Sequence, residues 1–337
     1  MSRYRLAVVL SQAQGKNPVK RGLEESLTAA LLVEPGLEVS IVPHLYDLGP
    51  DHTGRLFLGS VKGDMVVLSW LFPRAAFWLL DRIGVQGREG TSQLKSMSRD
   101  DEEEGQSEPP KGIGAGEVPD RVITCLDLRD ARGPDAFVAE VRRLYEDGQQ
   151  RAEEKLKSWV GGQPNLVSLG RYLRDEEPQA FAPAELLQAP ERRWYPVIDY
   201  SRCTNCMECI DFCLFGVYGV DKLDRILVES QDNCKKGCPA CSRVCPEHAI
   251  MFPDHKTPSI AGAATGTTGG LKIDLTKLFG GDDALVLAAQ ERDAELVKDG
   301  RQEVGLTVGV PKRQADRPQG PKDDLDRLVD QLDALDI

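Results

Sequence analysis

Apolar runs alternate with amphipathic segments over the first half of the chain. Runs of largely apolar residues, typical of strands buried on both faces, occupy residues 6–11, 38–45, 64–70 and 121–128. Helical periodicity follows at residues 18–33, 73–83 and 134–159, and the second of these segments opens with a proline, which suits a first helical turn. Strands that alternate with helices favour a parallel sheet with crossover helices. The pattern therefore predicts an α/β domain with a mainly parallel sheet over residues 1–150.

A polar stretch interrupts this domain between its third and fourth predicted strands. Residues 88–119 include five consecutive acidic residues from Asp100 to Glu104 and offer little to bury, which predicts a disordered acidic insertion. The glycine-rich residues 112–116 follow an acidic tract instead of a strand, so they favour a linker over a phosphate-binding loop. Residues 151–195 are expected to form a connecting region.

A Gly-rich linker and a helical acidic tail are predicted for residues 256–337. Residues 260–270 are rich in Gly, Ala and Thr but lack the Gly-Lys-Ser/Thr ending of a P-loop, and residues 284–298 have a helical pattern. Apolar residues recur with helical spacing in the tail, at Leu325, Leu328, Val329, Leu332 and Leu335. We expect this helix to pack on its own chain; binding a partner is the alternative.

Composition excludes several classes of protein. The chain has 337 residues, 28% of them charged, and a net charge of -12, which argues against a sequence-independent nucleic-acid binder. Residues 99–117 and 316–337 carry net charges of -5 and -4, so most of the acidity lies in the insertion and the tail. No apolar stretch reaches the roughly 18 residues of a membrane span, and no secretory signal is evident. A cytoplasmic location is expected, and the oligomeric state is left open.

Eight of the nine cysteines are concentrated in residues 203–245. They form two runs, Cys203-x2-Cys206-x2-Cys209-x3-Cys213 and Cys234-x3-Cys238-x2-Cys241-x3-Cys245-Pro246. In a reducing compartment, clustered cysteines indicate metal more often than disulfides. Three thiolates two residues apart suit one face of an iron-sulfur cubane, because a tight turn points successive sulfurs inward.

Residues 196–253 resemble the bacterial-type ferredoxin domain with two [4Fe-4S] clusters. The second run ends in Cys245-Pro246-Glu247-His248-Ala249-Ile250, which is similar to the family's Cys-Pro-x-x-Ala-Ile ending. The resemblance implies a small α+β fold in which the fourth cysteine of each run ligates the other cluster. It implies one cluster on Cys203, Cys206, Cys209 and Cys245, and another on Cys234, Cys238, Cys241 and Cys213. It also implies electron transfer between partner oxidoreductases.

The block departs from the family pattern at two positions. Three residues separate Cys234 from Cys238 where the family usually has two, and we expect Gly237 to accommodate the extra residue with an unusual backbone angle. Leu214 follows Cys213 where the family usually has proline. A zinc site, disulfides or a single cluster are the alternatives, and Cys125 is expected to be a buried thiol outside the site.

The rest of the chain has few chemical signatures. The loop 11–16 and residues 69–70 would follow the carboxyl ends of strands one and three, where doubly wound sheets bind ligands, but they lack a GxGxxG motif. The four histidines form no ligand-spaced pair. Bases close to the cysteines either tune a cluster or are solvated surface charges; they are Arg202, Lys235, Lys236 and Arg243.

The leading hypothesis is therefore an electron carrier rather than a catalyst. The first alternative is an enzyme whose N-terminal domain binds a flavin or a small substrate that the clusters serve. The second alternative is a scaffold in which the clusters are structural.

Overall fold

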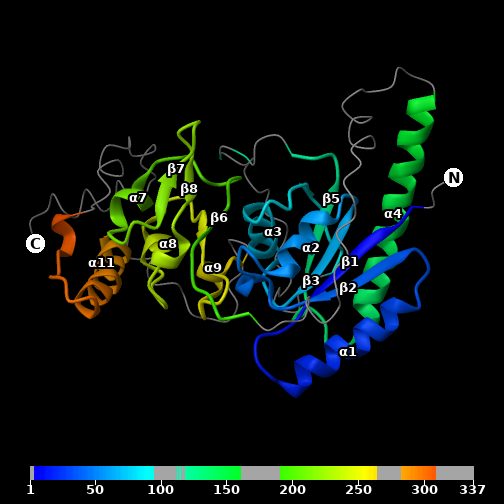
Figure 1. Ribbon diagram of the computed structural model, residues 1–337, viewed down its shortest axis with the longest axis horizontal. Helices are drawn as coiled ribbons and strands as arrows, with labels where there is room; N and C mark the ends of the chain where they lie inside the picture. The colour runs from blue at the N-terminus through cyan, green and yellow to red at the C-terminus, as the bar shows by residue number, and fades with distance from the viewer. Residues whose placement is uncertain are drawn as a thin grey trace, which may run out of the picture.

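A computed structural model describes residues 4–94, 112, 114, 118–160, 190–263 and 282–308. An open sheet with its helices lies beside a smaller cysteine-rich part, and a helix from the C-terminal region covers the far side of that part (Figure 1). No helix among these residues has the length and the apolar character to cross a membrane.

The N-terminal part is built on a sheet of five parallel strands in the order β2-β1-β3-β5-β4. Its strands are β1 (Leu6–Ser11), β2 (Leu37–Val42), β3 (Met65–Ser69), β4 (Arg88–Glu89) and β5 (Val122–Asp127). Its helices are α1 (Pro18–Leu32), η1 (Leu45–Asp47), α2 (Thr53–Ser60), α3 (Pro73–Arg82) and α4 (Pro134–Val160). The predicted α/β fold with a mainly parallel sheet is confirmed.

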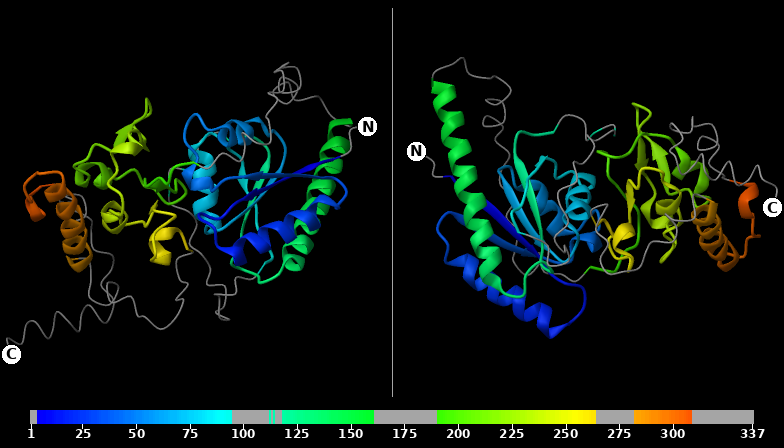
Figure 2. Two further views of the ribbon diagram at one scale, coloured as in Figure 1. Left: turned by 60° about the horizontal axis from the view of Figure 1, so that its bottom comes forward. Right: turned by 180° about the vertical axis from the view of Figure 1, so that it is seen from behind.

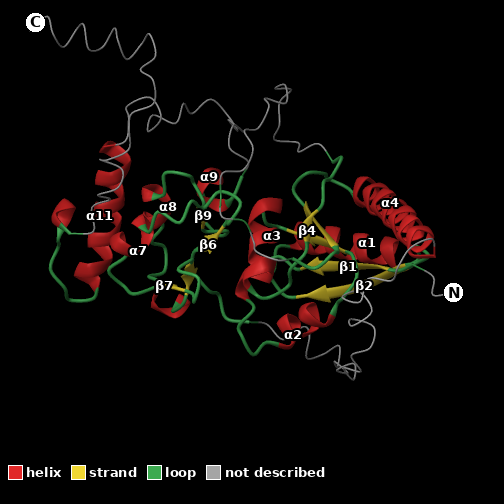
Figure 3. Ribbon diagram, turned by 90° about the horizontal axis from the view of Figure 1, so that it is seen from above, coloured by secondary structure: helices red, strands yellow, loops and turns green. Residues whose placement is uncertain are grey.

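Alternate residues of the central strands enter two different cores. Leu6, Val8 and Leu10 pack on the side that α1 and α4 cover. Val9 and Val67 face the side of α2 and α3 (Figure 3). Both faces of the sheet are buried because helices cover each of them. This explains why the strand sequences are continuous apolar runs.

Local signals fix the helix starts. Asn17 accepts hydrogen bonds from the backbone N–H groups of Val19 and Lys20, and Pro18 occupies the first turn of α1. The predicted helices therefore begin at the prolines where they were expected.

Helix α2 and strand β4 are among the short elements that were not predicted. Helix α2 has only eight residues, and β4 has two, which pair with β5 between Arg88 and Val122 and between Glu89 and Ile123. The stretch 88–119, expected to be a disordered insertion, thus begins with a strand. Residues 95–111 lie outside the described residues. The backbone N–H groups of Gly112 and Gly114 donate to the carbonyls of Ser201 and Tyr200.

The cysteine-rich part contains short strands and short helices. Its strands are β6 (Val197–Ile198), β7 (Tyr218–Val220), β8 (Ile226–Val228) and β9 (Ile250–Met251), which form the antiparallel pairs β6-β9 and β7-β8. Its helices are α7 (Glu208–Phe212), η2 (Gln231–Asn233), α8 (Ala240–Val244) and α9 (Pro258–Ala261). This is the small α+β arrangement that was expected.

The C-terminal region is helical where the structure describes it. Helix α11 (Asp282–Lys298) confirms the predicted helix, and the short η3 (Gly305–Thr307) follows it. Helix α11 packs on α8, and two further views show it against the cysteine-rich part (Figure 2). A linker was predicted at residues 260–270, but its first residues belong to α9, and Ile260 is buried. The connecting residues 161–189 and the predicted tail helix lie outside the described residues.

One hydrophobic core joins the sheet to the cysteine-rich part. Val197 and Met251 belong to the same core as α3 and η1. Tyr46 and Tyr195 exchange hydrogen bonds across this junction: the Tyr46 hydroxyl accepts from Tyr195 N at 2.7 Å, and the Tyr195 hydroxyl donates to Tyr46 O at 2.9 Å. The two parts therefore pack as one body at this junction.

Candidate iron-sulfur site

The two cysteine runs fold as a structural repeat. Each short helix carries the third cysteine of its run as its second residue, Cys209 in α7 and Cys241 in α8. Each helix also ends at the fourth cysteine, because Cys213 and Cys245 donate their backbone N–H groups to the carbonyls of Cys209 and Cys241. The matched spacing of the sequence thus produces two matched turns of helix.

Left-handed backbone conformations shape the loops before these helices. In the first run, Asn205 and Met207 have φ of 59° and 65°. In the second run, Gly237 has φ of 90°, and a Cβ there would meet no atom within 4 Å. Glycine adopts this conformation without the steric cost that other residues have. The expectation that Gly237 accommodates the longer Cys234–Cys238 loop is confirmed.

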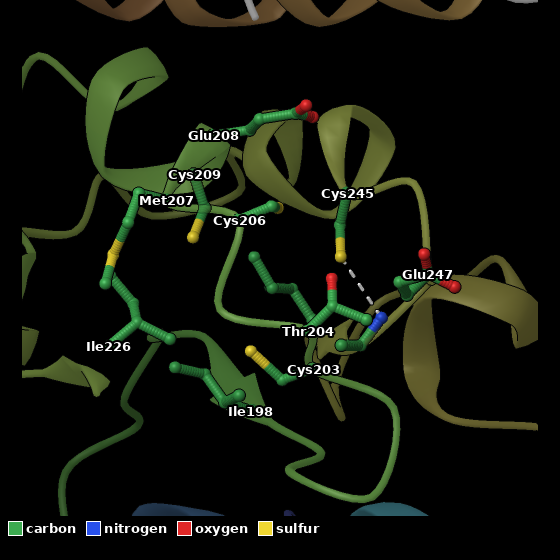
Figure 4. A pocket seen from close by; sticks show the side chains of 12 residues that line it. Ile198, Cys203, Thr204, Cys206, Met207, Glu208, Cys209, Ile226, Cys245 and Glu247 are labelled. Carbon is green, nitrogen blue, oxygen red and sulfur yellow. Dashed lines mark hydrogen bonds between the residues drawn. The ribbon is translucent and has the colours of Figure 1, made fainter. Parts of the chain in front are cut away.

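Four cysteines line one cavity of about 370 Å³, which we call the first cavity. They are Cys203, Cys206, Cys209 and Cys245. Figure 4 shows the sulfurs of Cys203, Cys209 and Cys245 directed into the same space from different segments. Cys245 therefore lies with the first run, although it belongs to the second.

The remaining four cysteines line another cavity, of about 330 Å³, which we call the second cavity. They are Cys213, Cys234, Cys238 and Cys241. Each cavity thus has one cysteine from the other run.

In both repeats, the fourth cysteine accepts hydrogen bonds from the backbone N–H groups two and four residues after it. Burial raises the pKa of the Cys213 thiol, and the N–H groups of Phe215 and Val217 act against this by bonding to its sulfur. Burial raises the pKa of Cys245 to about 11, and the N–H groups of Ala249 and Glu247 oppose the rise in the same way. The donor from Ala249 lies 3.3 Å from the sulfur. These donors stabilise negative charge on the sulfurs.

Burial is the main cause of the raised thiol pKa values around both cavities. It raises the pKa of Cys238 to about 11 and holds the pKa values of Cys209 and Cys241 well above the ordinary value. A buried thiolate needs a positive partner, and a metal centre supplies one. These cysteines are thus suited to bind a positively charged group.

The cysteines of each cavity surround a space instead of meeting at a point. Among the described residues, no three His, Cys, Asp or Glu side chains lie close enough together to bind one metal ion. A tetrahedral zinc ion, with Zn–S bonds of about 2.3 Å, requires its four sulfurs within about 4 Å of one another. Four cysteines around a cavity are the kind of ligand set that a [4Fe-4S] cluster takes.

A buried hydroxyl in the first cavity also fits a bound group. Thr204 lines this cavity, and its Oγ1 is buried with no hydrogen-bond partner in the structure (Figure 4). An unsatisfied buried hydroxyl costs free energy, and an acceptor bound in the cavity would remove that cost.

Three of the four bases near the cysteines form ion pairs within the chain. Arg202 lies 4.0 Å from Asp199, Lys235 lies 2.6 Å from Asp299, and Arg243 lies 2.8 Å from Glu291. Lys236 is exposed. Cys125 lies on β5, buried in the core of the sheet, away from both cavities.

The loop after β1 is tied to the chain itself. The Ser11 hydroxyl donates to the carbonyl of Pro43 at 3.2 Å and accepts from the N–H of Leu45 at 2.9 Å. The Gln14 amide donates to Asp47 at 2.8 Å and to Asp254, beyond the cysteine runs, at 2.7 Å. This loop therefore helps to join the two parts.

Sequence reasoning missed two side chains that line the second cavity, Tyr218 and Arg292. The Tyr218 hydroxyl donates to the sulfur of Cys241 at 3.0 Å. The sequence repeat could have indicated Tyr218, because it lies five residues after Cys213 just as Ile250 lies five residues after Cys245. Equivalent positions of a repeat are expected to lie near equivalent cavities. Arg292 comes from α11, and no spacing in the sequence links it to the cysteines.

Comparison with known proteins gave one partial match. No family model matches the chain, and no solved structure matches it. An uncharacterized ferredoxin of Methanocaldococcus jannaschii is 39% identical over 66 residues. The match covers 19% of this chain and 44% of that protein, so the chain spans less than half the length of the relative. The chain therefore contains a ferredoxin-like segment.

Proposed function

We propose that the protein is an electron carrier with two [4Fe-4S] clusters. Cys203, Cys206, Cys209 and Cys245 would hold one cluster in the first cavity. Cys213, Cys234, Cys238 and Cys241 would hold the other in the second cavity. Each cluster would accept one electron from a reducing partner protein and pass it to an oxidising one.

The observation that carries this proposal is the exchange of the fourth cysteines between the two cavities. Spacing alone puts three cysteines of a run near one another. Folding is required to bring Cys245 to the first run and Cys213 to the second. The backbone donors at Phe215, Val217, Glu247 and Ala249 support it further, because a cluster with four thiolates is anionic.

In this proposal the residues 196–255 form the redox domain and residues 1–150 form an α/β domain attached to it. The shared core places α3 directly beneath β6 and β9. We propose that the α/β domain serves as the platform on which the redox domain is fixed.

Anaerobic purification of the full chain, followed by iron and acid-labile sulfide analysis and by EPR of the reduced protein, tests the proposal. Two clusters require about eight irons and eight sulfides per chain. Four irons would reject the second cluster, and zinc without sulfide would reject iron-sulfur chemistry altogether. Clusters that are not reduced and reoxidised reversibly would favour a structural role, and a bound flavin would favour an enzyme.

Variants of the exchanged cysteines test the ligand sets. Cys245→Ala should disturb the EPR signal of the cluster in the first cavity, because it removes a sulfur from that cavity. Cys213→Ala should disturb the other signal. If Cys245→Ala disturbs the same signal as Cys241→Ala, each run holds its own cluster and the exchange is wrong. Cys125→Ala is the matched control and should change neither signal.

A further inference from the structure

The two cavities differ in the charges around them. Lys235 and Arg292 line the second cavity, whereas Glu208 and Glu247 line the first. Among the described residues that line the first cavity, there is no Lys or Arg. The repeated fold thus surrounds its two sets of cysteines with opposite charges.

Arg292 is the least expected of these groups, because α11 lies outside residues 196–253, whose cysteine pattern resembles that of ferredoxins. Its side chain is 1% exposed, and its guanidinium carbon lies 4.5 Å from the centre of the Phe212 ring. It donates to the carbonyls of Gly305 and Val308 and forms an ion pair with Asp293 at 2.9 Å. Asp293 does not line the cavity. Of this pair, only the cation therefore lines the second cavity.

A second difference is the hydrogen bond from Tyr218 to Cys241. Tyr218 is the first residue of β7 and the fifth residue after Cys213. Ile250 is the first residue of β9 and the fifth after Cys245, and it lines the first cavity with hydrocarbon. The Thr204 hydroxyl lines the first cavity, but it forms no hydrogen bond to a sulfur there. The Tyr218 bond therefore distinguishes the second cavity and acts in the same direction as Arg292.

Lys235 pairs with Asp299 at 2.6 Å, so Arg292 is the main positive group of the second cavity; like Asp293, Asp299 does not line that cavity. Glu291 and Glu295 of α11 face Cys238, but they pair with Arg243 at 2.8 Å and with Lys298 at 2.5 Å. Arg202 lies near Cys245, but it shares Asp199 with Arg74.

We propose that Arg292 and Tyr218 give the centre in the second cavity the higher reduction potential of the two. This inference rests on the proposed function, because it requires a cluster in each cavity. Adding one electron to a cluster increases its negative charge by one, so a nearby cation and a hydrogen bond to a ligand sulfur favour the reduced state. An electron that a reducing partner delivers to either cluster then comes to rest in the second cavity.

Potentiometric titration of the full chain, purified anaerobically and followed by EPR, tests the inference. We expect two reduction waves. Arg292→Gln should lower the midpoint of the higher wave by about 59 mV, which corresponds to a tenfold change in a one-electron equilibrium constant. Arg292→Lys keeps the charge and should restore most of the shift, which separates the charge from a packing defect. Tyr218→Phe should lower the same wave and leave the other unchanged.

Matched controls and iron content separate the possible failures. Arg142→Gln on α4 and Tyr145→Phe remove the same groups far from both cavities and should leave both waves unchanged. If eight irons are present but Arg292→Gln and Tyr218→Phe shift the lower wave, or shift neither, the inference is wrong and the proposed function stands. A single wave for both clusters would also overturn it. If eight irons are not found, the proposed function itself fails.

Discussion

Arg74 of α3 connects the sheet to the cysteine-rich part through a buried ion pair. Its Nε lies 2.5 Å from Asp199 Oδ2, and its guanidinium also donates to the carbonyl of His248 at 2.6 Å. Asp199 is 2% exposed, and its own carbonyl accepts from the backbone N–H of Cys203. One side chain of the α/β domain thus supports segments next to two cysteines of the first cavity.

Replacing Arg74 with methionine should destabilise the protein strongly. Removing one partner of a buried pair typically costs about 3–5 kcal/mol, because the remaining charge is left buried. The lower end applies here, since the Ser201 hydroxyl still bonds to Asp199 and Arg202 lies 4.0 Å away. One kcal/mol shifts the unfolding midpoint of a cooperative unit of about 150–250 residues, such as the sheet and the cysteine-rich part together, by about 2–4 °C. The midpoint of Arg74→Met should therefore fall by about 6–12 °C.

Circular dichroism of anaerobic samples at one fixed scan rate measures this shift. Arg74→Met combined with Asp199→Asn should recover part of the loss, because the double variant no longer buries an unpaired carboxylate. Arg5→Met is the control, since its ion pair with Glu38 is exposed and should matter little. The reasoning is refuted if Arg74→Met behaves like Arg5→Met, or if the double variant is no more stable than the single one.

Three further predictions concern other parts of the chain. Burial raises the pKa of Glu140, but hydrogen bonds from Arg143, Gln93 and Ser92 outweigh it and hold the pKa below its ordinary value. The stabilisation is therefore fully present above the ordinary pKa of a glutamate and is lost as the pH falls through the lower folded-state pKa. Glu140→Gln should therefore cost about 1–2 kcal/mol at pH 7, and urea titrations from pH 7 to 3 should show the difference shrinking; a difference that is constant with pH would contradict this. Gly237→Ala should cost about 1–2 kcal/mol, because alanine is strained at a φ of 90°, while iron content stays unchanged; an unshifted unfolding midpoint would show that the loop relaxes. Cys125→Ala should lower the unfolding midpoint slightly and leave iron and sulfide content unchanged, and a loss of iron would mean that Cys125 is a ligand.

The sequence predicted those features that depend on short-range patterns. The apolar runs and the prolines predicted the long strands and helices, because burial on both faces and first-turn prolines leave local signatures. The cysteine spacing and Gly237 predicted the turns around the cysteines, because both depend only on the local backbone conformation.

Features that depend on distant segments were not predicted. Strand β4 has only two residues and exists because β5 offers it a partner. Arg292 reaches the second cavity because α11 packs on α8, and nothing near Arg292 in the sequence reports that contact. The hydrogen bonds between Tyr46 and Tyr195 join residues that lie 149 positions apart.

The exchange of cysteines between the two cavities also sets an order of completion during synthesis. A ribosome produces the chain from the N-terminus at about 5–20 residues per second. The second cavity has all of its cysteines once Cys241 has emerged, whereas the first cavity, whose cysteines begin at Cys203, waits for Cys245. The site that starts earlier in the chain is therefore finished later. A nascent chain that stops between Cys241 and Cys245 has one complete set of cysteines, and that set belongs to the second cavity.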